Sequence, residues 1–228
     1  MFDFSREAIL SILYALPAIF FCLSIHEFAH GYVAYKLGDP TARNLGRLTL
    51  NPVKHIDPFG IIALLFVRFG WAKPVPVNTR YFKKPKRDMA LTALAGPLSN
   101  IISAFVFSFL YALVLRLYLN FLLSSPAFNE KTLVLWEAVI SIVQNFVFIN
   151  ISLAVFNLIP IPPLDGSKIL DIVLPTKVFL AYHKYEQYIS MALMILLVAT
   201  NVFSPFIRWA TESIAEILFY IPQKVFLS

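Results

Sequence analysis

The sequence predicts an all-α polytopic membrane protein that forms a single domain over residues 1–228. Hydrophobic residues make up 59% of the chain and charged residues 14%, whereas soluble domains average roughly 45–50% and 25%. The mean hydropathy of +0.73 is that of a chain solvated mostly by lipid. Long apolar runs separated by basic connections complete the pattern and predict four transmembrane helices.

The first span is expected from about Ala8 to Val33, in an apolar run that contains Pro17 and a few polar residues. The run is longer than the apolar core of a signal peptide, and the N-terminus carries Asp3, Arg6 and Glu7 instead of the basic region of a signal peptide. We therefore expect this segment to stay in the folded protein as a transmembrane helix.

The connection after the first span is expected to form a small β-hairpin at the membrane margin. Residues 36–58 are polar and rich in turn residues, and the apolar run 60–69 is too short to cross about 30 Å of hydrocarbon. Residues 47–50 and 73–77 alternate apolar residues with polar residues or proline, which is typical of short strands.

Three more spans are expected at about 89–122, 133–158 and 188–203. The tail from 206 to 221 is predicted to be either an amphipathic helix at the membrane interface or a fifth membrane helix. One face of that helix would carry the apolar residues of the tail: Ile207, Ala210, Ile214, Leu218 and Ile221.

Lysine and arginine residues cluster in the first connection and predict the orientation. Residues 36–87 hold 11 of them, whereas the connection after the next span holds only Arg116 and Lys131. Because cytoplasmic loops are enriched in these residues, the N-terminus is expected outside and the Asp165 region on the cytoplasmic side. Topology thus explains the net charge of +6, and no nucleic-acid partner is expected.

His26-Glu27-Phe28-Ala29-His30 is an H-E-x-x-H motif inside the first predicted helix. Histidines four residues apart share a helical face and can bind one Zn²⁺, while Glu27 can take a proton from water at the metal. From this composition, only about 0.002 chance occurrences of the motif are expected. Ionisable groups in a spanning helix are also costly to bury, which favours a functional site.

A catalytic zinc needs a third protein ligand and an open position for water. Asp165 and Asp171 are the carboxylates near the cytoplasmic ends of the other spans. Prolines before Asp165 stop the helix and Gly166 permits a tight turn, so Asp165 can project back toward the histidines. The alternative is that Asp165 caps a helix beginning near Ser167. A two-histidine site that lacks a third ligand favours the ligand role.

On these residues and two further segments, the chain resembles the site-2 protease family of intramembrane zinc metalloproteases. The segments are 95–100 (AGPLSN) and 157–166 (NLIPIPPLDG), which follow the H-E-x-x-H motif in the family's order. The resemblance implies one Zn²⁺ per chain, with His26, His30 and Asp165 as ligands and Glu27 as general base. It also implies peptide hydrolysis within or near transmembrane segments of membrane proteins, as in regulated intramembrane proteolysis.

The resemblance further implies that the hairpin offers a strand edge to an extended substrate. The 122–133 connection is too short for the PDZ or CBS domains that some family members carry. Asn100 and Asn157 are further candidates for binding substrate or the developing oxyanion, although interhelical hydrogen bonding is an equal alternative. His55 is a candidate of the same kind, or an interfacial residue.

Two other functions fit a membrane zinc site without proteolysis: zinc transport or zinc binding, and a scaffold that presents its sheet edge to partners. A di-iron desaturase is excluded because the chain has only four histidines. The expected partners are the lipid bilayer and a transmembrane protein substrate, and the sequence leaves homo-oligomer formation open. The expected location is a prokaryotic cytoplasmic membrane, with the active site near its cytoplasmic side.

Overall fold

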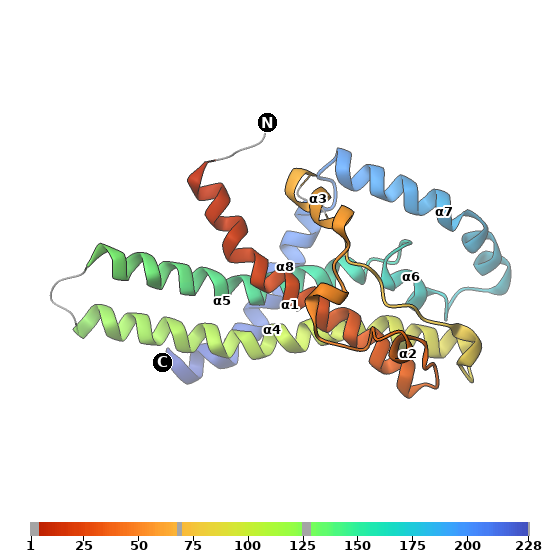
Figure 1. Cartoon of the computed structure of the whole chain (residues 1–228), viewed down its shortest axis with the longest axis horizontal. Coiled ribbons are helices and arrows are strands. Elements are labelled where there is room, and N and C mark those ends of the chain that lie inside the picture. The colour runs from red at the N-terminus through yellow and green to blue at the C-terminus, as the bar shows by residue number, and fades with distance from the viewer. Residues whose placement is uncertain (1–4, 68–69, 125–128, 228) are drawn as a thin grey trace.

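The computed structural model describes residues 5–67, 70–124 and 129–227, which fold into helices joined by irregular connections (Figure 1). In this part of the chain, three helices are long and apolar enough to span a membrane. They are α1 (Arg6–Lys36), α4 (Pro85–Ser124) and α5 (Glu130–Asn157). These helices match the first three predicted spans.

The three long helices form the body of the molecule. α4 and α5 pack side by side, and α1 crosses both of them (Figure 1). Buried side chains from α4, α5 and the last helix, α8 (Ser204–Phe226), form the core: Ala104, Val147, Ile151, Ala215 and Phe219. The late part of α1, the early part of α4 and the end of α5 meet at one end of this bundle.

α8 packs one face against α4 and α5. The buried residues are Thr211, Ala215, Phe219 and Pro222, so the buried face is offset by one residue from the predicted one. Ile214 and Leu218 of the predicted face are partly buried at the edge of the core. The tail is thus an amphipathic helix, and it is not among the candidate spans of the described chain.

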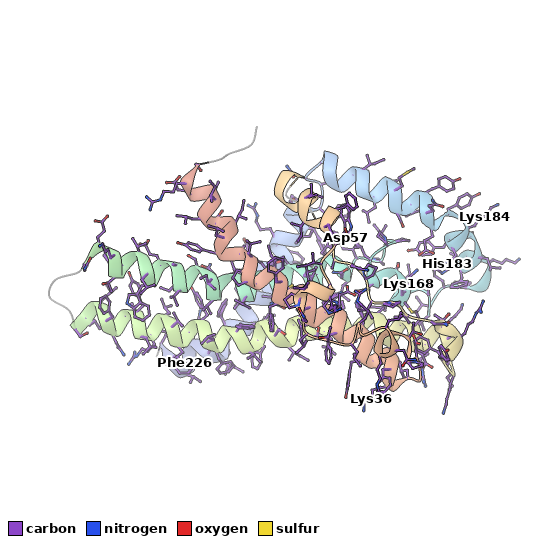
Figure 2. All side chains as sticks on the ribbon, viewed as in Figure 1. Lys36, Asp57, Lys168, His183, Lys184 and Phe226 are labelled. Atoms are coloured by element: carbon purple, nitrogen blue, oxygen red, sulfur yellow. The ribbon has the colours of Figure 1, made fainter. Side chains whose placement is uncertain are left out.

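The prediction of a fourth transmembrane helix over 188–203 is not supported. The helix there, α7 (Thr176–Ala199), is not among the candidate spans found in the described residues. Its first half is polar and contacts α6 (Asp165–Leu170), where Lys168 and His183 lie close together (Figure 2). The apolar part after Tyr188 covers only about 16 Å, roughly half the hydrocarbon thickness.

The predicted β-hairpin is also corrected, because the described residues contain no strand and only an isolated antiparallel bridge between Ile56 and Ala72. Pro74 and Pro76 have no N–H, so every second position of the predicted strand lacks a ladder donor. The connection instead contains short helical elements: α2 (Thr41–Asn44), η1 (Pro52–Lys54), α3 (Pro58–Val67) and η2 (Thr79–Tyr81).

Candidate active site

The H-E-x-x-H motif lies in the second half of α1, within the bundle. His26 and His30 are buried on the face of α1 that meets α4, and their rings are 4.5 Å apart between centroids. A helix places residues i and i+4 on one face, so the sequence spacing produces this pairing directly.

Each histidine ring is oriented by a hydrogen bond on its Nδ1 side. His26 Nδ1 is 2.7 Å from Oδ1 of Asn100, and His30 Nδ1 is 2.7 Å from the backbone oxygen of Thr92. Both partners are acceptors from α4, since Asn100 uses its Nδ2 to donate elsewhere. The protons therefore belong on Nδ1, which leaves each Nε2 lone pair available to a metal.

Asp165, the first residue of α6, faces both free ring nitrogens. Its Oδ2 is 3.1 Å from His26 Nε2 and 3.2 Å from His30 Nε2, yet this buried oxygen has no hydrogen-bond partner. Two ligand atoms, each about 2.0–2.1 Å from a tetrahedral zinc, are about 3.3–3.4 Å apart. The two nitrogen–oxygen distances at Asp165 are within about 0.3 Å of this spacing, so these atoms fit a shared zinc ion.

The charge of Asp165 also suits a metal ligand. Burial alone would raise the pKa of its carboxyl, but positive charge facing it outweighs burial: when the imidazoles of His26 and His30 carry a proton toward Asp165, this pKa falls to about 2. A carboxyl that faces positive charge, on the imidazoles or on a metal ion, is ionised at neutral pH, as a zinc ligand must be.

Two glycines let the ligand-bearing elements approach each other. A Cβ at Gly96 of α4 would be 2.5 Å from Cε1 and Nε2 of His30 and 2.7 Å from Cε1 of His26. A Cβ at Gly166 would collide with the backbone oxygens of Leu158 and Ile159 at the end of α5. Both positions thus require glycine for close packing around the site.

Glu27 places a second carboxylate beside the histidines. One of its oxygens lies within 4.8 Å of a ring nitrogen of each histidine. Its Oε2 accepts a 2.7 Å hydrogen bond from the backbone N–H of Val75, which belongs to the irregular segment after α3. Glu27 and Asp165 therefore have different surroundings: a backbone donor holds the first, and two imidazole nitrogens face the second.

The three weaker candidates have separate positions. Asn100 is fully buried and bonded to His26 and to Asn150 of α5, at 2.8 Å for the latter. Asn157 donates to the backbone of Leu153 in its own helix. His55 is buried, its Nε2 is 2.7 Å from the backbone oxygen of Thr49, and it lines an apolar pocket between α1, α3 and α5. A direct contact of these residues with substrate stays a prediction.

Several residues of the site were not predicted from the sequence. Thr92 and Val75 act through backbone groups, which leave no side-chain signal, and Asn150 takes part only through Asn100. Gly96 is a partial exception, because the stripe of small residues beside it, Ala95, Ser99 and Ser103, predicts close packing against a ligand-bearing helix. In the structure its neighbours are His30 and His26 of α1.

Comparison with known proteins places these residues in a family. Residues 14–199 match the sequence profile of Peptidase family M50. The Bacillus subtilis protein named "Putative zinc metalloprotease YwhC" is 38% identical over 215 residues, which are 93% of this chain and 94% of that protein. The Mycobacterium tuberculosis (H37Rv) protein named "Putative zinc metalloprotease Rip2" is 30% identical over 186 residues, covering 79% of this chain and 64% of that protein. No solved structure matches the chain.

Proposed function

Because this chain belongs to Peptidase family M50, we propose that His26, His30 and Asp165 hold its zinc ion and that Glu27 moves the proton in peptide hydrolysis. The family and the similar proteins make the chain a zinc metalloprotease of the membrane, and they support proteolysis over zinc transport. The observation that carries the ligand assignment is the position of Asp165 Oδ2, 3.1 and 3.2 Å from the two Nε2 atoms without a hydrogen bond.

The different roles proposed for the carboxylates of Asp165 and Glu27 follow from their contacts. When bound, Zn²⁺ supplies Lewis acidity that polarises a peptide carbonyl and makes water a stronger acid. Glu27 has its Oε2 held by Val75, so Oε1 is available to accept a proton from the attacking water. The same carboxyl then returns that proton to the leaving amine, which completes general acid–base catalysis.

We place the active site near the cytoplasmic side of a prokaryotic cytoplasmic membrane. The 11 Lys and Arg residues of 36–87 lie in the connection that follows α1, and they support a cytoplasmic position for it. By helix rise, His26 is about 28 Å beyond Glu7 along α1, near the border of a core about 30 Å thick. Water and substrate would reach the site from this side.

The substrate proposed for the site is a transmembrane segment of another membrane protein. Peptide carbonyls in a transmembrane helix are hydrogen-bonded within the helix and are shielded from attack. The substrate must therefore unwind locally, and cleavage is expected near residues that weaken helices, such as glycine and proline.

Cleavage of single-span reporter proteins by the purified protein tests this function. We compare wild type with Glu27→Gln and with Glu7→Gln, an exposed glutamate at the start of the same helix. Wild type and Glu7→Gln should cut within the reporter span, while Glu27→Gln should keep about one zinc per chain and lose cleavage by about 10²–10⁴-fold.

Two results would refute the proposed roles. Undiminished cleavage by Glu27→Gln would remove this residue as the proton carrier. Full zinc content in each of His26→Ala, His30→Ala and Asp165→Ala would show that the ion binds elsewhere.

A further inference from the structure

We propose that the backbone N–H of Val75 is a positioning group that holds Glu27 in its catalytic orientation. The inference rests on the proposed role of Glu27 and adds a residue from a separate segment, 71–78, here termed the strap. The N–H of Val75 donates to Oε2 of Glu27 at 2.7 Å. A glutamate side chain has three rotatable bonds, so one fixed oxygen restricts where the other can reach.

The strap is anchored before Val75 by contacts with the preceding connection. Ala72 forms a bridge with Ile56, and the N–H of Lys73 donates to the backbone oxygen of His55 at 2.8 Å. The backbone oxygen of Lys73 accepts a 2.7 Å hydrogen bond from Arg47.

The strap is also anchored after Val75. The N–H of Asn78 donates to Oδ2 of Asp39 at 2.6 Å, and Asp39 is fully buried just beyond the end of α1. Val75 itself is buried, and its Cγ1 would be 3.1 Å from a Cβ built at Gly31, one turn after Glu27. The strap is therefore held on both sides of the hydrogen bond, by the preceding connection before Val75 and by Asp39 after it.

The proline pattern of the strap restricts its backbone. Pro74 and Pro76 flank Val75, and a residue before proline is confined to extended or polyproline conformations. Val75 thus has a backbone N–H, whereas the prolines on both sides of it have no N–H. Because these prolines restrict the backbone, they also fix the direction in which the N–H of Val75 points. This arrangement suits a permanent support for Glu27 better than a plug that substrate must displace.

Replacing Val75 by proline removes the N–H while keeping an apolar side chain in an already proline-rich segment. Val75→Ala is the matched control, because it trims the side chain and keeps the N–H. With reporter substrates, we expect Val75→Pro to lower kcat by about 10–100-fold relative to Val75→Ala. KM and zinc content per chain should stay within about twofold, because the N–H of Val75 is bonded to Glu27 and not to a proposed zinc ligand.

A second measurement does not depend on activity or on a correct substrate. Amide hydrogen exchange at Val75 should be slow in wild type and in Glu27→Gln, whose amide oxygen still accepts, and faster by about 10-fold or more in Glu27→Ala. The reporter experiment with Glu27→Gln tests the proposed function itself, so failure of that function and failure of this inference give different results.

The outcomes are decisive in each case. Equal kcat for Val75→Pro and Val75→Ala overturns the proposal, and a higher kcat for Val75→Pro also overturns it because the contact would then be inhibitory. If Val75→Pro does not fold or loses zinc, hydrogen exchange decides. Unchanged exchange at Val75 in Glu27→Ala overturns the proposal, whereas faster exchange with retained zinc supports it.

Discussion

Gly96 of α4 lies directly against the imidazole of His30. A Cβ at residue 96 would be 2.5 Å from Cε1 and from Nε2 of this ring, and real Cβ atoms essentially never come that close to a neighbour. The ring of His30 cannot turn aside freely, because its Nδ1 is hydrogen-bonded to the backbone oxygen of Thr92, which lies on α4 one turn before Gly96. The two helices can therefore approach to this distance only if residue 96 has no side chain.

Gly96→Ala should consequently disturb the zinc site with a single methyl group. We expect zinc affinity to fall by at least about 10-fold. A methyl group that turns the His30 ring away from the metal should lower the affinity about as much as loss of a hydrogen bond that orients a ligand. Competition with a chromophoric chelator measures this affinity. Leu98→Ala, on the exposed side of α4, serves as the control and should bind zinc as wild type does. Wild-type affinity in Gly96→Ala would contradict the packing described here.

Asn100→Ala should weaken zinc binding through His26. The substitution removes the acceptor for His26 Nδ1 and leaves a buried N–H without its partner. Loss of such a contact lowers metal affinity by about 10–100-fold. Asn157→Ala is a matched control, because Asn157 donates only to the backbone of its own helix. Equal zinc affinities for the two variants would argue against the role of Asn100 in holding His26.

The parts of the site that could be predicted from sequence are those fixed by local geometry. His26 and His30 share a face because any helix brings i and i+4 together, and Glu27 follows from its place in the motif. Asp165 could be inferred because few carboxylates lie near the span ends. Val75 could not, since a backbone donor 48 residues from its acceptor has no distinctive residue type.

The errors in the predicted fold have physical causes. The 73–77 segment alternates as a strand does, but its alternation comes from prolines, which remove the donors that a ladder needs. The predicted fourth span was placed on its apolar residues alone, whereas the helix there begins earlier, at Thr176, with charged residues that contact α6. Hydropathy predicted the three long helices well because each of them contains a long apolar stretch.

Zinc removal should lower the thermal stability of the protein. An ion that binds the native state at 100 times its Kd stabilises it by about 2.7 kcal/mol, which corresponds to about 5–10 °C in Tm for a chain of this size. Differential scanning fluorimetry in detergent, with and without a chelator, measures the shift. The Tm of His26→Ala should not change when the chelator is added. A chelator effect of equal size in this variant would mean that the stabilising metal is bound elsewhere.

Glu186 of α7 connects that helix to α6. Its Oε1 is 2.5 Å from Lys168 Nζ and its Oε2 is 2.8 Å from His183 Nδ1, and Figure 2 places Lys168 and His183 close together. Burial would raise the pKa of Glu186, but the hydrogen bonds from Lys168 and His183 outweigh burial and hold it below its ordinary value of 4.5.

The lowered pKa of Glu186 fixes the sign of a pH effect on stability. Because the unfolded chain binds this proton more readily than the native chain, the stabilisation is present above about pH 4.5 and is lost as the pH falls below that value. Glu186→Gln should therefore lower Tm by about 2 °C at pH 7, as expected for a partly exposed ion pair worth about 0.5–1 kcal/mol. At about pH 3.5 the difference from wild type should shrink markedly. The control is Glu212→Gln, at an exposed position of α8, whose Tm should match that of wild type at both pH values. If the Tm difference between Glu186→Gln and wild type does not change with pH, the carboxylate charge of Glu186 does not hold α7 to α6.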